Sequence, residues 1–364
     1  MRLPIALDYR PALLSRAGIG RVTRELARAL AARDDLDVHL FGHSLAPARV
    51  AAEVPQAARL HRLPIPGRSL GTLARFGLPA ERLAGGARVF HWTDYVQPPV
   101  GGAGVVLTVH DLAFVREPAW HGAAAATLRE RTRAAIGRAD AVIVASATTA
   151  SDVREFAPDA AARLFVVPFG ADHVPADATG APAPARAEPY ALCVGTIEPR
   201  KNHRTLLAAW RQLPAPCPKL VVVGAIGWQC DEIVAELAAA ERDGLIEWRR
   251  DCDDATLWQL LRDAALSVYP SLWEGFGLPP IEAMACGVPV VANDTPALRE
   301  LVGDAAVLAN ATDADSLAAA IAATLANRDR LARSARARAA QFRWAECAAR
   351  HAEIYRDVAG ETAR

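Results

Sequence analysis

The sequence predicts an α/β protein with two parallel-sheet domains. Short apolar runs alternate with amphipathic helical stretches from one end of the chain to the other, a pattern typical of parallel strands joined by crossover helices. The 364 residues suffice for two domains of ordinary size. Residues 171–189 are rich in proline, alanine and aspartate and lack periodicity, so we interpret them as an interdomain linker. We therefore expect Rossmann-like domains over residues 1–170 and 190–341.

The first domain is expected to begin with a strand and to alternate strands with helices. Apolar runs predict strands at residues 3–7, 38–41, 89–91, 105–109, 142–145 and 165–168. Helical periodicity fits residues 20–32, 123–137 and 148–156.

The same alternation restarts after the linker. Strands are predicted at residues 190–194, 220–223, 246–249, 266–269 and 288–292. Helices are predicted at residues 204–213, 231–243, 254–263 and 315–325. An open α/β sheet binds its ligand beyond the carboxyl ends of its strands. Two such domains facing each other would therefore place the active site in the cleft between them.

Composition excludes several classes of protein. The net charge is zero and the pI about 7.1, so no basic field indicates nucleic-acid binding. No apolar run approaches the ~18 residues that cross a bilayer, and Asp8 comes too early for a signal peptide; we expect a cytoplasmic protein. The six cysteines form no C-x-x-C pair, which indicates neither a zinc site nor a disulfide framework.

The most informative stretch is residues 274–282, in which two carboxylates flank glycines and a Pro-Pro step. The prolines prevent a helix from continuing through, so we expect Glu274 in a loop and Glu282 in a helix that Pro280 begins. Gly275 and Gly277 leave the backbone bare for a ligand. A helix start there offers free N–H groups and a partial positive charge. This combination predicts a seat for a nucleotide diphosphate joined to a hydroxyl-rich group.

Two adjacent cations, Arg200 and Lys201, follow the predicted strand 190–194. They therefore lie at a carboxyl strand end, where ligands bind. An arginine fork and a lysine charge suit a diphosphate. The alternative is a solvated turn that pairs with Glu198, and we favour the diphosphate because the Glu274 loop lies in the same half of the chain.

The two carboxylates suggest separate contacts. Glu282 could accept hydrogen bonds from a ribose diol, whereas the alternative is an acid that complements its own helix N-terminus. Glu274 could bind sugar hydroxyls or stabilise positive charge that develops at an anomeric carbon.

In the first half, His110 ends a predicted strand and could contact a sugar hydroxyl; a structural histidine explains it almost equally well. Gly18 and Gly20 open the first helix and resemble half of a dinucleotide fingerprint. Thr23 stands where the third glycine belongs, which argues against an NAD site. We therefore interpret the segment with Gly18 and Gly20 as a loop that closes over a phosphate or an acceptor.

The D-x-D matches at residues 251–253 and 313–315 do not indicate a metal. Asp313 and Asp315 fit the start of a helix, and Asp253 or Asp254 fits the cap of the helix at 254–263. We assign no metal.

Together these residues make the chain resemble the retaining glycosyltransferases of family 4, which have the GT-B architecture. The E-x7-E stretch at 274–282 is that family's hallmark. The resemblance extends over nearly the whole chain, through residues 18–20, 110–111, 195–202, 269–271, 283–290 and 342–344.

The resemblance implies that the C-terminal domain binds the nucleotide sugar and the N-terminal domain the acceptor. Arg200 and Lys201 would hold the diphosphate, with Glu274 beside the donor hexose and Glu282 on the ribose. Amides from Phe276, Gly277 and Leu278 would contact sugar and phosphate, His110 the donor sugar, and Gly18 and Gly20 the phosphates. The segment 342–364 would cross back onto the first domain, anchored by Trp344, Ile354 and Tyr355.

The implied reaction retains the anomeric configuration without an obligatory enzyme nucleophile and without a divalent metal. Among relatives, the pattern looks most like bacterial mannosyl- and deoxyhexosyltransferases of surface polysaccharide and lipopolysaccharide (O-antigen) assembly. That resemblance favours a GDP-sugar donor, although no residue visibly selects the base or the sugar epimer, and it implies a glycan or lipid-linked glycan acceptor.

Acceptor residues are predicted after the strand 89–91. Trp92, Asp94 and Tyr95 could line the acceptor site, and core packing is an equal alternative. The arginine-rich residues 59–75 could touch an anionic membrane, although a solvated helix and loop explains them better. Two other classes stay open: a GT-B-like epimerase, and a noncatalytic nucleotide-sugar binder, against which the intact set of site residues argues.

Overall fold

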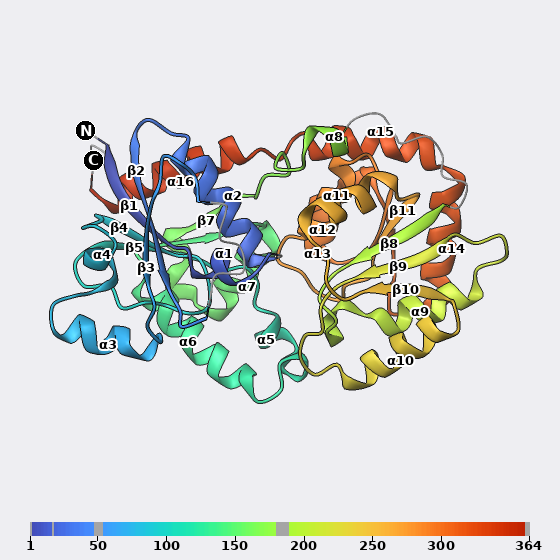
Figure 1. Cartoon of the computed structure of the whole chain (residues 1–364), viewed down its shortest axis with the longest axis horizontal. Coiled ribbons are helices and arrows are strands. Elements are labelled where there is room, and N and C mark those ends of the chain that lie inside the picture. Colours follow the sequence, from blue (N-terminus) through green and yellow to red (C-terminus); the bar gives the residue numbers. More distant parts are fainter. Residues whose placement is uncertain (1, 17, 47–53, 180–188, 361–364) are drawn as a thin grey trace. The chain divides into compact units, whose positions relative to one another are not determined.

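The computed structural model describes residues 2–16, 18–46, 54–179 and 189–360. The chain forms two compact units (Figure 1). The first unit comprises Met1–Leu112, Ala126–Gly170 and Arg343–Arg364, and the second comprises Ala113–Ala125 and Ala171–Phe342. Residues 113–125, which the sequence assigns to the first domain, thus pack with the second unit.

The first unit is built on a seven-stranded parallel sheet in the order β3-β2-β1-β4-β5-β6-β7. The strands are β1 (Leu3–Asp8), β2 (Leu36–His43), β3 (Arg59–Leu63), β4 (Val89–Trp92), β5 (Gly104–Thr108), β6 (Ala141–Val144) and β7 (Leu164–Val166). β1 pairs with β2 from Leu3 opposite Leu36 and with β4 from Ile5 opposite Val89. The strand order reverses between β1 and β4, which is where ligands of doubly wound sheets bind.

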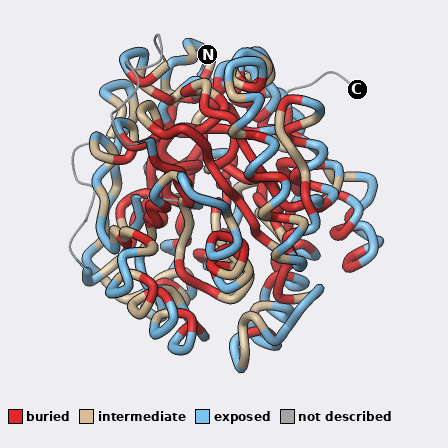
Figure 2. The backbone as a smooth tube through the Cα atoms, turned by 90° about the vertical axis from the view of Figure 1, so that its right-hand side faces the viewer, coloured by how far each residue is buried: buried red, intermediate tan, exposed pale blue. Residues whose placement is uncertain are grey.

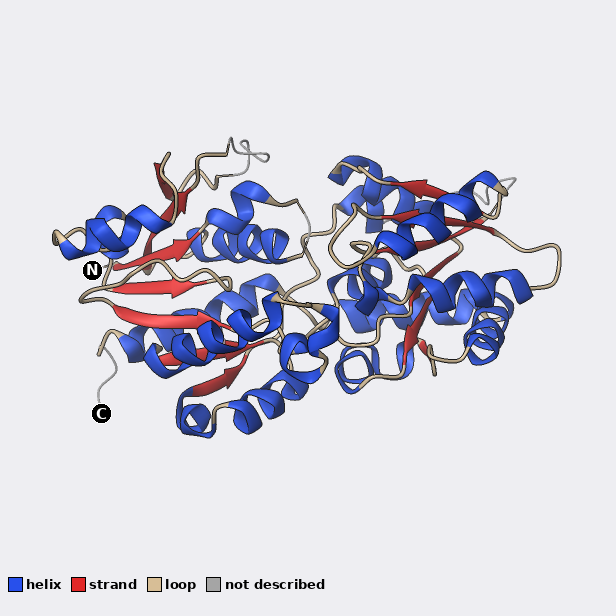
Figure 3. Cartoon of the chain, turned by 90° about the horizontal axis from the view of Figure 1, so that it is seen from below, coloured by secondary structure: helices blue, strands red, loops and turns tan. Residues whose placement is uncertain are grey.

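Helices cover both faces of this sheet (Figure 3). They are α1 (Arg10–Leu14), α2 (Ile19–Ala31), α3 (Arg68–Arg75), α4 (Ala80–Leu83), α6 (Ala124–Arg138), α7 (Ala147–Phe156), the 3₁₀ helix η2 (Pro158–Arg163) and α16 (Trp344–Val358). The central strands are buried on both sides, as parallel sheets require. Figure 2 shows the buried backbone of the chain in red, with exposed segments in pale blue around it.

The C-terminal helix α16 packs on the first unit, which confirms the expected crossover. Tyr355 is fully buried, and its hydroxyl lies 2.8 Å from Nδ1 of His91 on β4. Trp344 stacks on Phe169, with ring centroids 6.0 Å apart. Ile354 is buried as well.

The second unit repeats the design with a six-stranded parallel sheet in the order β10-β9-β8-β11-β12-β13. Its strands are β8 (Tyr190–Val194), β9 (Lys219–Val223), β10 (Ile246–Arg249), β11 (Leu266–Tyr269), β12 (Val290–Asn293) and β13 (Val307–Ala309). Its helices are α5 (Ala113–Arg116), η1 (Pro118–Trp120), α8 (Ala176–Thr179), η3 (Pro199–Lys201), α9 (His203–Gln212), α10 (Asp231–Arg242), α11 (Asp254–Asp263), α12 (Leu278–Ala285), α13 (Pro296–Val302), η4 (Gly303–Ala305), α14 (Ala314–Ala326) and α15 (Arg328–Ala339). Here the order reverses between β8 and β11.

Several segments differ from the sequence prediction. The sequence does not predict helices α13 and α15. Of residues 59–75, expected as a helix and loop, residues 68–75 form helix α3 but residues 59–63 form strand β3, because an edge strand can keep its arginines in solvent and shows only weak apolar alternation. β13 has three residues, too few for a periodic signal. Residues 171–179 of the expected linker belong to the second unit and include α8; residues 180–188 lie outside the described part of the chain. Among the described residues, no helix combines the length and apolarity that a membrane span needs.

Candidate functional site

The buried carboxylate of Glu274 is the centre of the candidate site in the second unit. It lies in the loop between β11 and α12, and the residue is 8% exposed. Its Oε1 atom accepts hydrogen bonds from Lys201 Nζ at 2.5 Å and from Ser271 Oγ at 2.6 Å. Tyr269 donates to the same oxygen at 2.8 Å, and Arg200 Nη1 lies 2.9 Å from Oε2. Both predicted cations, Arg200 and Lys201, therefore contact the same carboxylate.

The strand order explains why these residues meet. Arg200 and Lys201 lie in η3, directly after β8, and β8 is hydrogen-bonded to β11, which leads into the Glu274 loop. Asn202 follows in a left-handed conformation, with φ 58°, and its side-chain amide donates to the carbonyl of Ala311 at 2.6 Å. The cations thus project from a fixed turn at the reversal point of the sheet, as predicted for a ligand site.

Ionisation in this cluster follows from burial and charge. Burial opposes ionisation of Glu274, but Arg200, Lys201 and the hydrogen bonds they and Ser271 supply outweigh it and lower its pKa to about 2. Burial raises the pKa of Glu198, whose Oε1 accepts from Arg200 Nη2 at 2.8 Å. Of the three ammonium donors of Lys201, two are directed at Tyr269 and Glu274, which leaves one for a ligand.

Helix α12 begins at Leu278, two residues earlier than predicted. The Pro-Pro step therefore lies within its first turn, and two of its four unpaired N–H groups are missing. Gly277 caps the helix with φ 105°, a conformation that favours glycine. Phe276 is buried, and its ring packs edge-on against Phe342 at 5.8 Å. Fewer backbone amides than expected are thus available here.

Glu282 is also buried, at 2% exposure, on α12. Its Oε1 lies 2.9 Å from Nε2 of His173. The ring of His173 packs edge-on against Trp258, with centroids 5.7 Å apart. Sequence reasoning missed His173 because it lies in the aperiodic stretch interpreted as a linker, and no local signal marks it.

In the first unit, His110 follows β5 and its Nε2 lies 2.9 Å from the carbonyl oxygen of Thr93. Burial lowers its pKa, so the imidazole is neutral. Asp94 forms an ion pair with Arg10, and the hydroxyl of Tyr95 donates to the Asp111 carbonyl at 3.1 Å. These side chains cluster at the carboxyl ends of β4 and β5.

Trp92 contributes to packing. It is 2% exposed, and its indole nitrogen donates to the carbonyl of Pro98 at 3.0 Å. The side chain therefore belongs to the core, which was one of the two alternatives from the sequence.

The two glycines at the start of α2 differ in their surroundings. A Cβ at Gly20 would lie 2.2 Å from the carbonyl oxygen of Ser15, so close backbone packing explains this glycine. Gly18 has φ 56°, and a Cβ there would meet nothing within 4 Å. Its backbone is therefore open to a neighbouring group.

Two protein families match this chain. The family described as "Glycosyltransferase Family 4" matches residues 16–174, and "Glycosyl transferases group 1" matches residues 180–342. The two matches together cover every strand of both sheets except β1. The chain belongs to glycosyltransferase family 4.

Individual family 4 relatives match parts of the chain. The O-antigen chain mannosyltransferase B of Escherichia coli is 39% identical over 173 residues, covering 46% of this chain and 45% of that protein. The D-inositol 3-phosphate glycosyltransferase of Nocardia farcinica is 33% identical over 276 residues, covering 69% of this chain and 60% of that protein. The matched part thus spans less than two thirds of these relatives.

A solved structure covers both units. The sucrose-phosphate synthase of Thermosynechococcus elongatus is 27% identical, with a TM-score of 0.80 over 99% of this chain and 100% of that chain. The fold is therefore that of the GT-B glycosyltransferases, with two Rossmann-like parallel-sheet domains.

Proposed function

We propose that this family 4 protein transfers a hexose, with mannose or a deoxyhexose favoured, from a nucleotide-diphosphate sugar to a glycan acceptor. The acceptor is a free or lipid-linked glycan of bacterial surface polysaccharide synthesis. The similarity to an O-antigen mannosyltransferase supports mannose as the transferred sugar, and we favour a GDP-sugar as its donor.

One observation carries the proposal: Arg200 and Lys201 converge on the buried Glu274 at the reversal point of the second sheet. Fixed cations at such a point suit a diphosphate whose negative charge grows as it leaves. The shared carboxylate holds both cations in place before a donor binds. Because it balances part of their charge, recognition relies on directed N–H donors more than on net charge.

The remaining residues complete a donor site. Glu282, which His173 contacts at 2.9 Å, would accept hydrogen bonds from a ribose diol. Amides of Gly277 and Leu278 face sugar and phosphate, and Phe276 supports their loop from the core. From the first unit, His110 would contact the donor sugar and Gly18 a phosphate, while Gly20 keeps the turn closed.

The reaction proposed is retention at the anomeric carbon. The bond between that carbon and the diphosphate oxygen breaks, and the acceptor oxygen bonds to the carbon on the same face. The leaving diphosphate takes the proton of the acceptor hydroxyl. Asp94 and Tyr95 are the acceptor-side residues in the first unit.

The test is a transfer assay with GDP-mannose, UDP-glucose, ADP-glucose and dTDP-rhamnose, each with and without a mannobiose acceptor. We expect acceptor-dependent consumption of one donor and an anomeric NMR coupling that shows the donor's configuration. A parallel arm with EDTA checks the expected independence from metal. Consumption of no donor, or conversion of the sugar nucleotide without acceptor, would refute the proposal and favour a binder or an epimerase.

A further inference from the structure

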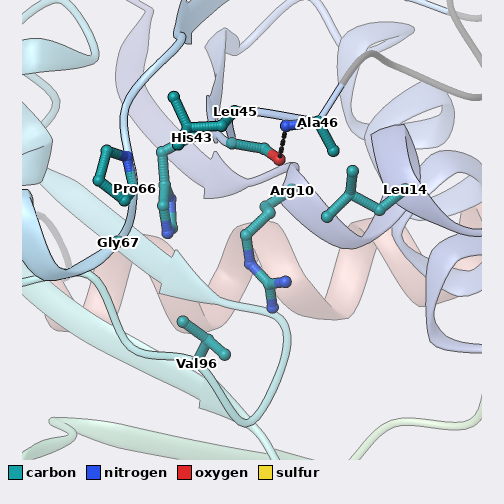
Figure 4. Close-up of a pocket in the computed structure, with 9 residues that line it drawn as sticks. Arg10, Leu14, His43, Leu45, Ala46, Pro66, Gly67 and Val96 are labelled. Atoms are coloured by element: carbon teal, nitrogen blue, oxygen red, sulfur yellow. Dashed lines mark hydrogen bonds between the residues drawn. The ribbon is translucent and has the colours of Figure 1, made fainter.

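A cavity of about 380 Å³ lies in the first unit, apart from the residues assigned so far to donor binding. Its walls come from α1, the end of β2, and the loops that follow β3 and β4. The residues that line it include Arg10, Leu14, His43, Leu45, Pro66 and Val96. Figure 4 shows Arg10 and His43 extending side by side into this space, with Leu14 and Val96 beyond them. The cavity thus opens at the carboxyl edge of the sheet, where α/β folds bind ligands.

Two polar side chains enter the cavity without a full set of partners. The Arg10 guanidinium is engaged by Asp94 through Nη2, which leaves Nη1 for a ligand. Nδ1 of His43 is buried without a hydrogen-bond partner among the described residues. Buried polar groups are normally hydrogen-bonded, so these two groups are suited to hydroxyls of a bound molecule.

The cavity carries no net positive charge. The charge of Arg10 is balanced by Asp94, and Asp8 lies directly behind, accepting the Arg10 backbone N–H at 3.1 Å. His43 is neutral, because burial and the nearby Arg10 lower its pKa to about 4. A phosphate would meet a guanidinium that the Asp94 carboxylate already neutralises, whereas anion sites offer uncompensated cations. An uncharged ligand fits better.

The rest of the wall is apolar. Leu14, Leu45, Pro66 and Val96 face the two polar groups, and Leu45 and Val96 are 69% and 39% exposed. A pyranose ring has the matching character, with hydroxyls at its edge and C–H groups on its face. The volume lies within the roughly 300–1,000 Å³ of small-molecule sites.

We propose that this cavity binds one uncharged hexose residue at the growing end of the acceptor glycan. The inference rests on the proposed function and narrows it: the enzyme recognises a neutral sugar of the acceptor, not the phosphate that links a glycan to lipid. Arg10 and His43 bind hydroxyls, and Leu14 and Val96 pack on the ring face.

The experiment measures glycoside binding to the full chain by saturation-transfer NMR and titration calorimetry, without nucleotide. The probes are the methyl glycosides of mannose, glucose, galactose, N-acetylglucosamine, rhamnose and fucose, with mannose 6-phosphate as the anionic comparison. Val96→Trp fills the cavity. Val166→Trp is the matched control, because Val166 is also 39% exposed and lies on β7. His43→Ala is a second, smaller change in case the tryptophan disturbs folding.

We expect at least one methyl glycoside to bind, with affinity reduced at least tenfold by Val96→Trp and by His43→Ala but not by Val166→Trp. Mannose 6-phosphate should bind at least tenfold more weakly. Binding of no glycoside, equal binding by Val96→Trp, or preference for the phosphorylated sugar would overturn the inference. GDP titration of the same samples distinguishes failure of the proposed function from failure of the cavity inference. If the unmodified protein binds no nucleotide, the proposed function is contradicted. If it binds nucleotide but no glycoside, only the inference about the cavity is contradicted.

Discussion

At the scale of single residues, the environment decides what each ionisable group can do. Glu274 and Asp8 are both buried carboxyl groups at carboxyl strand ends, yet their pKa values are shifted in opposite directions. Two cations beside Glu274 outweigh its burial. At Asp8, burial dominates over the attraction of Arg10 and raises the pKa to about 7. One acid is therefore a permanent anion and the other titrates near neutrality.

Replacing Lys201 tests the donor site directly. We expect Lys201→Ala to lower kcat/KM by roughly 10²–10³-fold, because it removes a charge aimed at the leaving diphosphate. The fold should survive, since Glu274 keeps Arg200, Ser271 and Tyr269 as partners. Lys219, the other lysine of the chain, is the exposed first residue of β9 and pairs with Glu247 at 3.2 Å.

Lys219→Ala is therefore the matched control and should leave transfer within twofold of the unmodified protein. Near-normal transfer by Lys201→Ala, with a circular dichroism spectrum like the native one, would remove Lys201 from the diphosphate site.

The raised pKa of Asp8 predicts an unusual pH dependence of the free energy of unfolding. Its pKa in the folded state is about 7, above the ordinary value of 3.8, so between these values the folded protein binds a proton that the unfolded chain has lost. The free energy of unfolding therefore falls as pH rises through this window, by up to about 4 kcal/mol from this group.

Asp8→Asn removes that penalty, so its stability relative to the unmodified protein should increase from pH 4 to pH 7.5. Urea unfolding at several pH values measures the difference, with the exposed Asp159→Asn as control. Parallel stability profiles for Asp8→Asn and the unmodified protein would show that Asp8 is not protonated at neutral pH.

At the scale of elements, strand order and helix ends position the site. In each sheet the order reverses at the first strand, between β1 and β4 and between β8 and β11. In the first unit, Asp8 ends β1 and Asp94 lies in the loop after β4; in the second, Arg200 follows β8 and Glu274 follows β11. Helix ends fix the neighbouring loops, as Ser146 does by accepting the Thr149 N–H at 3.1 Å.

Asp253, in the D-x-D stretch at residues 251–253, stabilises the start of helix α11. Asp253 caps α11 by accepting the N–H of Thr256 at 2.8 Å, so Asp253→Ala should lower the free energy of unfolding by about 1 kcal/mol. Asp251 in the same stretch is exposed, and Asp251→Ala should change it by less than about 0.5 kcal/mol. Denaturant titration compares the two, and equal effects would contradict the capping role.

At the scale of the whole molecule, each unit has its own sheet and core, and the C-terminal helix belongs with the first unit although it follows the second in sequence. The first unit is therefore complete only when the end of the chain has been made. The proposed donor residues of the second unit all lie within residues 200–282. They follow strands of the six-stranded sheet, which is formed entirely by this unit.

Nucleotide binding should consequently stabilise the protein by mass action. A nucleoside diphosphate at 100 times its dissociation constant adds about 2.7 kcal/mol to the stability of the fold that binds it. Differential scanning calorimetry with GDP, UDP, ADP and dTDP should show one base raising Tm more than the others. Glu282→Ala should weaken that nucleotide's affinity at least tenfold, because we propose that its carboxylate, which His173 contacts at 2.9 Å, binds the ribose.

The control for this effect is Glu232→Ala, whose side chain is 83% exposed and pairs with Arg204. Unchanged nucleotide affinity in Glu282→Ala, by titration calorimetry, would contradict the ribose contact.

Local patterns in the chain were enough to predict the alternating strands and helices, the E-x7-E loop and the adjacent cations after β8, because periodicity and turn residues act locally. Resemblance to family 4 also predicted the C-terminal crossover. Three contacts became visible in the folded chain alone: Glu274 is shared by Arg200 and Lys201, His173 holds Glu282, and Arg10 and His43 face one cavity. Those contacts join residues far apart in the chain, and strand order, which no local pattern encodes, brings them together.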